Sequence, residues 1–593
     1  MEYTSKEVYE YVSRKMNDPI MERKKCSVSW QDFPIYKSDL QFYSKVSPIF
    51  DVPEDYAKQF FEKNNDVKDC FEYKNGVLKA KLPTPTLCPE ERRRRRFSIC
   101  NEKSLYKRKC DYSGENMISI FSPNKQNKVY KNSYRWNDSW DPLKYWEDKD
   151  QEFWISIKKL LDNVPIFCNF CVNWVNSDYT NHAVQPKDSY MCFGVIEPVN
   201  SLYIRQANKA ENCVDCYYII QSSNCYNCIN IVKSFNMISC TDCTNCSFCI
   251  NCAWCIWCHD CFDCCDLDNK SYCINNIQYT KEEYKKNVAN AKIANRNRNI
   301  LWCKLKMSEN SFWNNLVNAQ NSAFIYDIES CSNTKYTDSE VELEDTYDSY
   351  WAKSKLSLEI ISCSDLYHCG FIFYWNNNSE CRYCWSCYNS KNLFWCIWLK
   401  NKEYCIYNKQ YTKEEYNKIV PEIIAQMIRD KERWEFFDPK LSYFGYNEST
   451  AMEYCPLTKE EALKKWYKRE DFEPPLPQVE KNVQWKDLPK QWCKIIQDKK
   501  PEILQKILNY AVICEISKKP FRITKQEIDF YVKYNIPLPT KHPDIRHQER
   551  LARKDPTTMH LIHCDQCWEE MLSVHKKWPW KTILCEKCYY SQK

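Results

Sequence analysis

Cysteines recur at every third residue, or at a multiple of three, along two long stretches of the chain. The first stretch holds Cys213, Cys216, Cys225, Cys228, Cys240, Cys243, Cys246, Cys249, Cys252, Cys255, Cys258, Cys261, Cys264 and Cys273, and the second holds Cys363, Cys369, Cys381, Cys384, Cys387, Cys396 and Cys405. A β-strand repeats at every second residue and an α-helix after about 3.6 residues, so neither produces this period. Polyproline II and β-solenoid backbones both accommodate it. Because few prolines or glycines lie within the frame, the pattern predicts a β-solenoid.

The frame positions are typical of a packed interior. Where cysteine is missing, apolar residues occupy the frame: Ile219, Ile231, Met237, Leu267, Leu366, Ile372, Leu393 and Leu399. An apolar side chain cannot replace a thiolate ligand, but it can replace a buried cysteine, which packs as a small hydrophobic residue. We therefore expect the cysteines to face inward as packing groups. Metal or iron–sulfur ligation, and a redox role for the densest run from Cys240 to Cys265, are the alternatives.

Two segments of the chain are near copies of each other. They read NKSYCINNIQYTKEEYKKNV from Asn269 and NKEYCIYNKQYTKEEYNKIV from Asn401. Each copy ends a run of frame cysteines and contains a capping box, Thr280 with Glu283 and Thr412 with Glu415, which predicts the start of a helix. Such a helix covers the exposed edge of the last coil. We expect a mainly β fold with α-helices, in which a cysteine-lined β-solenoid forms two duplicated segments, each closed by a helix.

The two ends of the chain are also related to each other. CSVSWQDFPIYKSDLQFYSK from Cys26 aligns without gaps with CEISKKPFRITKQEIDFYVK from Cys514, and KCDYSGENMISIF aligns with HCDQCWEEMLSVH. Between them, PTPTLCPEERRRRRF from Pro83 aligns with PLPTKHPDIRHQERL from Pro537. The expected organisation is an N-terminal module at 1–150, a first solenoid with its helix at 165–300, a second solenoid with helices at 301–440, and a related C-terminal module at 490–593.

The C-terminal module contains two CxxC pairs, Cys564 with Cys567 and Cys585 with Cys588. Their separation is typical of a zinc-ribbon or treble-clef site, in which four thiolates surround the ion as a tetrahedron. Four protein ligands leave no open position for water, so we expect a structural rather than a catalytic Zn²⁺.

Other cysteines and histidines near the modules leave alternatives open. His542, His547, His560, His563 and His575 crowd the C-terminal module as outer donors, surface groups or part of a second site with Cys514. In the N-terminal copy, Ser113, Lys131 and Tyr134 stand where the C-terminal module has Cys567, Cys585 and Cys588, so the four-thiolate site is lost there. Cys26, Cys88, Cys100 and Cys110 are either buried thiols or a different site.

Arg92, Arg93, Arg94, Arg95 and Arg96 form an uninterrupted basic run. Clustered guanidinium groups can neutralise phosphates, so the run is a candidate surface for a nucleic-acid or protein partner. The commoner cause of such a run is a solvated helix face. The net charge of the whole chain, +6, is weak support for an anionic partner.

Composition points to a cytoplasmic protein that does not enter a membrane. Apolar runs are too short to span a bilayer, and the first residues lack the apolar stretch of a secretory signal. In the cytoplasm the 39 cysteines would stay mainly as thiols.

The chain has only five glycines beside 22 tryptophans. Trp568 follows a CxxC pair, and Trp254, Trp257 and Trp395 precede frame cysteines, positions that favour glycine. We interpret these tryptophans as UGA codons read as glycine, with a tryptophan-rich genome as the alternative.

Several motifs together resemble one family. FPIYKSDLQFY, LPTPTLCPEERRRRRF, KCDYSGENMISIFSP, the Asn/Asp-Cys frame, NKEYCIYNKQYTKEEY, PFRITKQEIDFYVKYNIPLP and CEKCY are similar to an uncharacterised cysteine-rich family of candidate-phyla bacteria with zinc modules and a β-solenoid. Its members commonly carry CPxCR, where this chain has Cys88-Pro-Glu-Glu91 and His542-Pro-Asp-Ile545, which puts zinc at those segments in doubt. Some of these lineages read UGA as glycine. The resemblance implies an architecture and no activity.

The sequence thus favours a non-enzymatic protein with a structural zinc site and a β-solenoid scaffold for protein or nucleic-acid interaction. No phosphate loop, nucleophile elbow or zincin helix is present in the chain. The alternative is a thiol-redox or metal-storage protein that uses the cysteine frame. The two hypotheses differ in metal stoichiometry, which is about one ion per chain for the first and several for the second.

Overall fold

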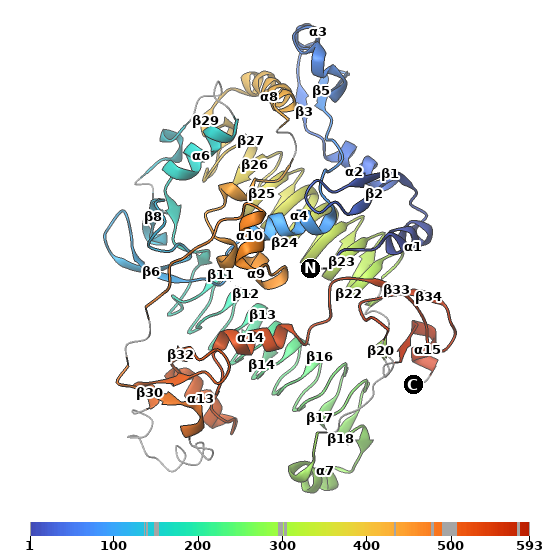
Figure 1. Ribbon diagram of the computed structural model, residues 1–593, viewed down its shortest axis with the longest axis vertical. Helices are drawn as coiled ribbons and strands as arrows, with labels where there is room; N and C mark the ends of the chain where they lie inside the picture. The colour runs from blue at the N-terminus through green and yellow to red at the C-terminus, as the bar shows by residue number, and fades with distance from the viewer. Residues whose placement is uncertain are drawn as a thin grey trace.

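Two β-solenoids and two small modules make up the protein, as the computed structural model shows (Figure 1). The structure describes residues 2–135, 137, 140–146, 153–293, 300–301, 305–306, 308–431, 435–475, 479–488, 507–577 and 582–591. The predicted cysteine-lined β-solenoid fold, mainly β with α-helices, is therefore confirmed.

The first solenoid is a stack of parallel coils, each twelve residues long. Ile219 lies beside Ile231 and Ile231 beside Cys243, so every coil shifts the register by twelve residues, which is four triplets. Its strands are β10 (Cys171–Val172), β11 (Asn181–Val184), β12 (Phe193–Ile196), β13 (Arg205–Glu211), β14 (Tyr217–Ser223), β15 (Ile229–Val232), β16 (Thr241–Thr244), β17 (His259–Phe262) and β18 (Ser271–Ile274), followed by the antiparallel β19 (Ile277–Gln278).

Each triplet turns at a residue with positive φ that directly precedes an inward-facing residue. Asp242 and Asn251 both have φ of 54°. Asn and Asp are frequent here because their short polar side chains tolerate the left-handed region. Phe248 occupies a corner of the same kind and adopts the same left-handed conformation, with φ of 53°. Hydrogen bonds between coils hold these corners, as between Asn251 N and Ile238 O at 2.9 Å.

The frame cysteines face the interior, as predicted. All nine from Cys240 to Cys264 are at most 1% exposed, and they share one core cluster with Ile219, Ile231 and Met237. Each thiol also donates to backbone carbonyls; Cys240 Sγ lies 3.3 Å from Cys249 O and 3.4 Å from Ile238 O. The cysteines therefore act as small packing groups whose weak S–H donors are satisfied.

Substitution of Cys246 tests this packing interpretation. Ser234 occupies the same inward column one coil earlier, where its Oγ donates to Val232 O at 2.8 Å. We expect Cys246→Ser to change the free energy of unfolding by no more than about 1 kcal/mol, because the hydroxyl replaces both the volume and the donor. The amount of metal bound per chain should not change. Denaturant unfolding and metal analysis measure the two quantities, and loss of metal would instead make the frame thiols ligands.

The second solenoid repeats this architecture with two irregularities. Its strands are β21 (Leu305–Lys306), β22 (Phe312–Gln320), β23 (Ala323–Ser332), β24 (Lys335–Tyr367), β25 (Gly370–Asn376), β26 (Arg382–Trp385), β27 (Lys391–Phe394) and β28 (Glu403–Ile406), with the antiparallel β29 (Lys409–Gln410) at the end. Successive positive-φ residues are five positions apart at Asn310 and Asn315, and again at Trp351 and Leu356 within β24, where two triplets would span six. These breaks explain why the three-residue spacing is loose between 310 and 360.

A helix follows each solenoid, as the capping boxes predict. These are α7 (Lys281–Asn287) and α8 (Lys413–Arg429), and in each the Thr hydroxyl accepts from the Glu backbone N–H while the Glu carboxylate accepts from the Thr N–H. α7 packs on β18 and α8 on β28, the last parallel strands of their solenoids.

The end modules share one order of elements, hairpin, helix, helix and hairpin. The N-terminal module has β1 (Ile20–Lys25), β2 (Asp32–Tyr36), α2 (Lys37–Val46), α4 (Pro89–Ser98), β6 (Tyr106–Lys109) and β7 (Asn116–Ser119). The C-terminal module has β31 (Tyr510–Ile513), β32 (Pro520–Phe521), α13 (Lys525–Lys533), α14 (Pro543–Leu551), β33 (His560–His563) and β34 (Glu570–Ser573), then β35 (Ile583–Leu584) and α15 (Glu586–Ser591). Residues 490–506, where we expected this module to begin, lie outside the described residues.

Further elements extend or connect these units. The N-terminal module carries an insertion between α2 and α4, made of β3 (Ile49–Asp51), α3 (Glu54–Lys63), β4 (Phe71–Lys74) and β5 (Val77–Ala80). The others are α1 (Lys6–Met16), β8 (Val129–Tyr130), α5 (Asn132–Arg135), α6 (Phe153–Asn163), β9 (Ile166–Phe167), β20 (Ile300–Leu301), α9 (Thr450–Tyr454), α10 (Lys459–Lys464) and β30 (Lys481–Gln484).

Each module docks on the solenoid that is more distant in sequence. In Figure 1, α4 of the N-terminal module lies on β24 of the second solenoid, and α14 of the C-terminal module lies across β13 and β14 of the first. The contacts are equivalent. Arg92 and Arg96 of α4 bind Asp348, whereas the aligned Arg546 and Arg550 of α14 bind Asp215. Both aspartates occupy positive-φ corners, at 58° and 57°.

The arginine run is therefore not exposed on the surface, and our interpretation of it as a solvated helix face or a partner-binding patch is wrong. Arg92, Arg94, Arg95 and Arg96 are all buried, and each has a carboxylate partner. Arg93, whose side chain is 15% exposed, pairs with Asp338 at 2.8 Å. The run anchors α4 to the second solenoid, so these guanidinium groups are not available to phosphates.

Candidate metal centre

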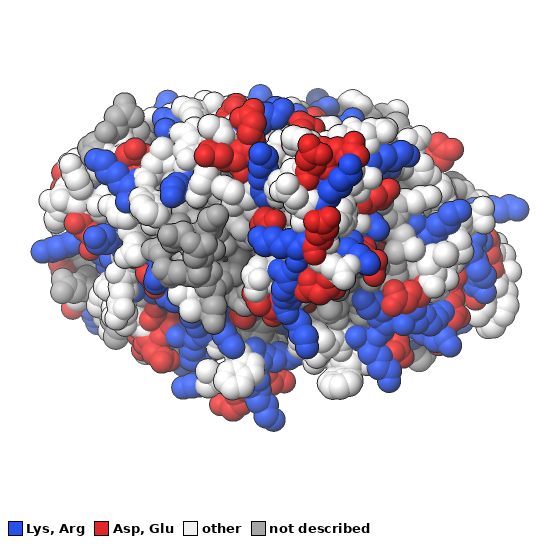
Figure 2. Space-filling model, turned by 90° about the horizontal axis from the view of Figure 1, so that it is seen from above, with Lys and Arg blue, Asp and Glu red and all other residues white. Residues whose placement is uncertain are grey.

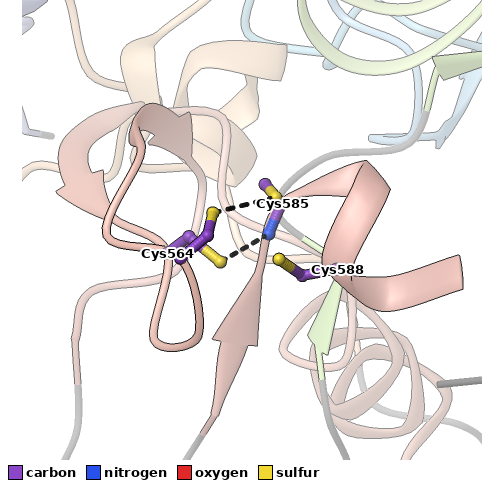
Figure 3. A group of neighbouring side chains, drawn as sticks. Cys564, Cys585 and Cys588 are labelled. Carbon is purple, nitrogen blue, oxygen red and sulfur yellow. Dashed lines mark hydrogen bonds between the residues drawn. The ribbon is translucent and has the colours of Figure 1, made fainter. Parts of the chain in front are cut away.

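Four cysteines converge in the C-terminal module. Cys564 and Cys567 lie in the turn between β33 and β34, and Cys585 and Cys588 lie at the start of α15, with all four sulfurs within 4.8 Å of one another. Figure 3 shows Cys564, Cys585 and Cys588 directed toward a common point. Cys567 Sγ is 3.6 Å from Cys585 Sγ. A tetrahedron with zinc–sulfur bonds of about 2.3 Å has edges of about 3.8 Å, so the spacing suits a tetrathiolate site.

The backbone shapes the turn that carries the first two cysteines. Cys564 N donates to Glu569 O at 2.9 Å, and Trp568 N donates to Cys564 O at 3.0 Å. This closes a tight loop in which Trp568 has φ of 64°. Asp565 joins the loop to β35, because its N–H donates to Ile583 O and its carboxylate accepts from Ile583 N at 2.7 Å. The two CxxC segments are thus held together by backbone bonds as well as by the thiols.

Electrostatics favour a thiolate at Cys564, whereas burial and the neighbouring thiols raise the pKa of Cys585 and Cys588. Burial raises the pKa of Cys564, but N–H groups of Cys567, Cys585 and Gln566 directed at its sulfur outweigh that effect and lower the pKa to about 6. The Cys585 N–H lies 3.3 Å from this sulfur. Cys564, Cys585 and Cys588 are buried and Cys567 is exposed. A set of four thiolates suits a soft or borderline cation and leaves no open coordination position.

The histidines of the module lie outside this cluster. Within the described part of the chain, the group of side chains able to hold a metal contains the four cysteines and no histidine. His547 contacts Glu453, His560 contacts Glu2 and His575 contacts Asp555. His563 stacks on the Trp568 ring, with the ring centroids 5.2 Å apart. His542 reaches Cys514 only through its backbone N–H, 3.2 Å from the sulfur.

Three other turns repeat the geometry of the Cys564 turn without its ligands. They begin at Cys26, Cys110 and Cys514, and the residue four positions later has positive φ in each case: Trp30, Gly114 and Lys518. The residue that directly precedes a helix faces each turn. These residues are Cys88 before α4, Lys131 before α5 and His542 before α14. All three turns have serine at the second ligand position. The sequence indicated the Cys110 turn through its alignment with the CxxC segment at Cys564, whereas the Cys26 and Cys514 turns align only with each other and were missed.

The four N-terminal cysteines do not form one site. Cys26 and Cys88 meet at the first turn, where Ser29 Oγ is 3.5 Å from Cys88 Sγ. Cys100 contacts the Tyr374 hydroxyl at 2.9 Å, and Cys110 accepts from Lys131 N at 3.3 Å.

The glycine interpretation of certain tryptophans stays a prediction. Trp254, Trp257, Trp395 and Trp568 all have positive φ, between 54° and 64°. Gly114 aligns with Trp568 and shares this backbone, with φ of 75°. In the solenoids, however, every corner has positive φ whatever its side chain, so the conformation alone does not single out Trp254, Trp257 and Trp395.

Comparison with known proteins gives no relative: no protein-family model and no curated protein matches the chain. Among the helices of the described residues, none combines the length and the apolar character that crossing a membrane requires.

Proposed function

We propose that this chain is a non-enzymatic cytoplasmic zinc protein whose solenoids form a scaffold for a protein partner. The observation that carries the proposal is the convergence of four thiols at tetrahedral spacing in a small module. Zn²⁺ is the ion that such a set most often holds in structural sites. The ion would be held by Cys564, Cys567, Cys585 and Cys588 and would stabilise the module rather than activate a water molecule.

A protein partner is favoured over duplex nucleic acid for two reasons. The arginine run is buried against carboxylates. On the face seen in Figure 2, Lys and Arg side chains are interspersed with Asp and Glu rather than gathered into one basic field. Phosphate backbones are bound mainly by concentrated positive charge. A face of mixed charge suits a partner that is itself mixed in charge.

Metal analysis tests the proposal against its alternative. Protein purified under reducing conditions should contain about one zinc per chain, and Cys564→Ser/Cys567→Ser should abolish it. A metal-storage protein would hold several ions and keep most of them in this variant. A thiol-redox protein would show rapid, reversible oxidation of frame thiols, whereas buried packing thiols should react only on unfolding.

A further inference from the structure

A cavity lies at each of the two interfaces between a module and a solenoid. Because the two interfaces are equivalent, aligned residues line the two cavities. One, which we call the first-solenoid cavity, lies between α14 and the first solenoid and encloses about 730 Å³. The other, the second-solenoid cavity, lies between α4 and the second solenoid and encloses about 350 Å³. Aligned residues line both: His547, Tyr203 and Arg205 in the first correspond to Arg93, Tyr336 and Asp338 in the second.

The charge of the two cavities has diverged. The first-solenoid cavity is lined by five cations, Lys103, Arg205, Arg522, Lys525 and Arg550, and by one carboxylate, Asp544. The second-solenoid cavity is lined by two cations and five carboxylates. Three of the five cations are paired with buried carboxylates: Lys103 and Arg205 with Glu453, and Arg550 with Asp215. The positive charge open to a ligand is therefore that of the exposed Arg522 and Lys525.

His547 lines this cavity, and one of its two ring nitrogens has no hydrogen-bond partner among the described residues. Its Nε2 lies 2.9 Å from Glu453 Oε1, and its Nδ1 is buried without a hydrogen-bond partner among the described residues. The side chain is only 10% exposed. Burial lowers the pKa of His547 to about 4, so the ring is neutral at pH 7, and its proton sits on the nitrogen that faces the carboxylate. Nδ1 is then an unsatisfied acceptor, but it is buried within the cavity wall, so it does not itself contact a ligand in the cavity.

Aromatic side chains form the solenoid wall of the same cavity. Tyr179, Tyr190 and Tyr203 come from consecutive coils, with ring centroids 5.2 Å and 5.8 Å apart along the row. Phe521 lies on the opposite, module side. Aromatic faces beside cations are the usual surroundings of a nucleobase joined to a phosphate.

From the volume, the exposed cations and the aromatic wall, we infer that the first-solenoid cavity binds a nucleotide unit. The phosphate is attracted by Arg522 and Lys525, and the base packs against the tyrosine row. A cavity of this size is within the usual range for small ligands. The unit is either a free mononucleotide or one residue of a single strand, because both offer the same chemistry. The inference does not depend on the metal site.

Calorimetric titration of the full chain with AMP, and separately with a short single-stranded oligoadenylate, tests the inference. Arg522 and Lys525 are exposed, so Arg522→Glu/Lys525→Glu should leave the fold intact and weaken binding by roughly tenfold or more. Lys37 aligns with Lys525 and is also exposed, but it does not line either cavity. Lys37→Glu is therefore the matched control and should bind as the parent does.

The outcomes separate the two sources and can overturn the inference. Saturation by AMP identifies a free nucleotide, and saturation by the oligoadenylate alone identifies a single strand. Dissociation constants above about 1 mM for both probes would overturn the inference. So would equal weakening by Lys37→Glu, which indicates non-specific attraction, or unchanged binding by the double variant.

Discussion

Removal of the proposed zinc ion should unfold the C-terminal hairpin and α15 while both solenoids stay folded. Apart from three of the four cysteines, the segment's own buried cluster contains Ile562, Met571, Ile583, Leu584 and Tyr589, while Leu572 of β34 packs into the main core. So few apolar side chains do not support a fold alone, and structural zinc contributes on the order of 10 kcal/mol to small modules. We expect Cys585→Ser/Cys588→Ser, or a strong chelator, to lower hydrogen-exchange protection in β33, β34 and α15 by about a thousandfold or more.

Cys110→Ser provides the matched control. Cys110 aligns with Cys564 and lies in an equivalent turn, but Lys131 and Tyr134 stand at the positions of Cys585 and Cys588. This substitution should change neither the metal content nor protection of the C-terminal hairpin. If chelation removed the metal and exchange in β33 to α15 stayed slow, the ion would be adventitious and the module would be stabilised by its contacts alone.

Local sequence patterns identified the parts of this fold that depend on short-range chemistry. The three-residue frame predicted the solenoid because one inward side chain per triplet is a local rule, visible at every coil. The capping boxes at Thr280 and Thr412 likewise depend on residues three positions apart. The four-thiolate cluster was predictable because zinc chemistry limits both the residue type and the spacing of Cys564, Cys567, Cys585 and Cys588.

The features of the fold that could not be predicted from the sequence depend on long-range geometry. A period of three does not say how many triplets close one coil, so the twelve-residue register could not be predicted. The cross-docking of modules pairs Arg92 with Asp348 and Arg546 with Asp215, residues separated by hundreds of positions. Because arginines are seldom fully buried, the run at Arg92 to Arg96 favoured a solvated face, and only its carboxylate partners reveal the opposite.

Asp348→Ala should detach the N-terminal module from the second solenoid. Arg92 Nε lies 2.9 Å from both carboxylate oxygens of Asp348, and Arg96 Nη1 lies 2.9 Å from one of them, with all three side chains at most 2% exposed. Removing the carboxylate leaves two guanidinium groups in a buried place, which costs about 3–5 kcal/mol. Hydrogen exchange in α4 should accelerate by roughly a hundredfold or more.

Two further variants separate this effect from a general loss of packing. Asp529→Ala breaks the exposed pair with Lys525 and should cost below about 1 kcal/mol, since both side chains are more than half exposed. Asp348→Leu/Arg92→Met/Arg96→Met removes the buried charges together and should recover most of the stability, because apolar groups of similar size can replace a buried ion pair. Asp215→Ala should act in the same way on α14, since Arg546 and Arg550 depend on it. If Asp348→Ala left exchange in α4 unchanged, the arginine–aspartate anchor would not be what holds module and solenoid together.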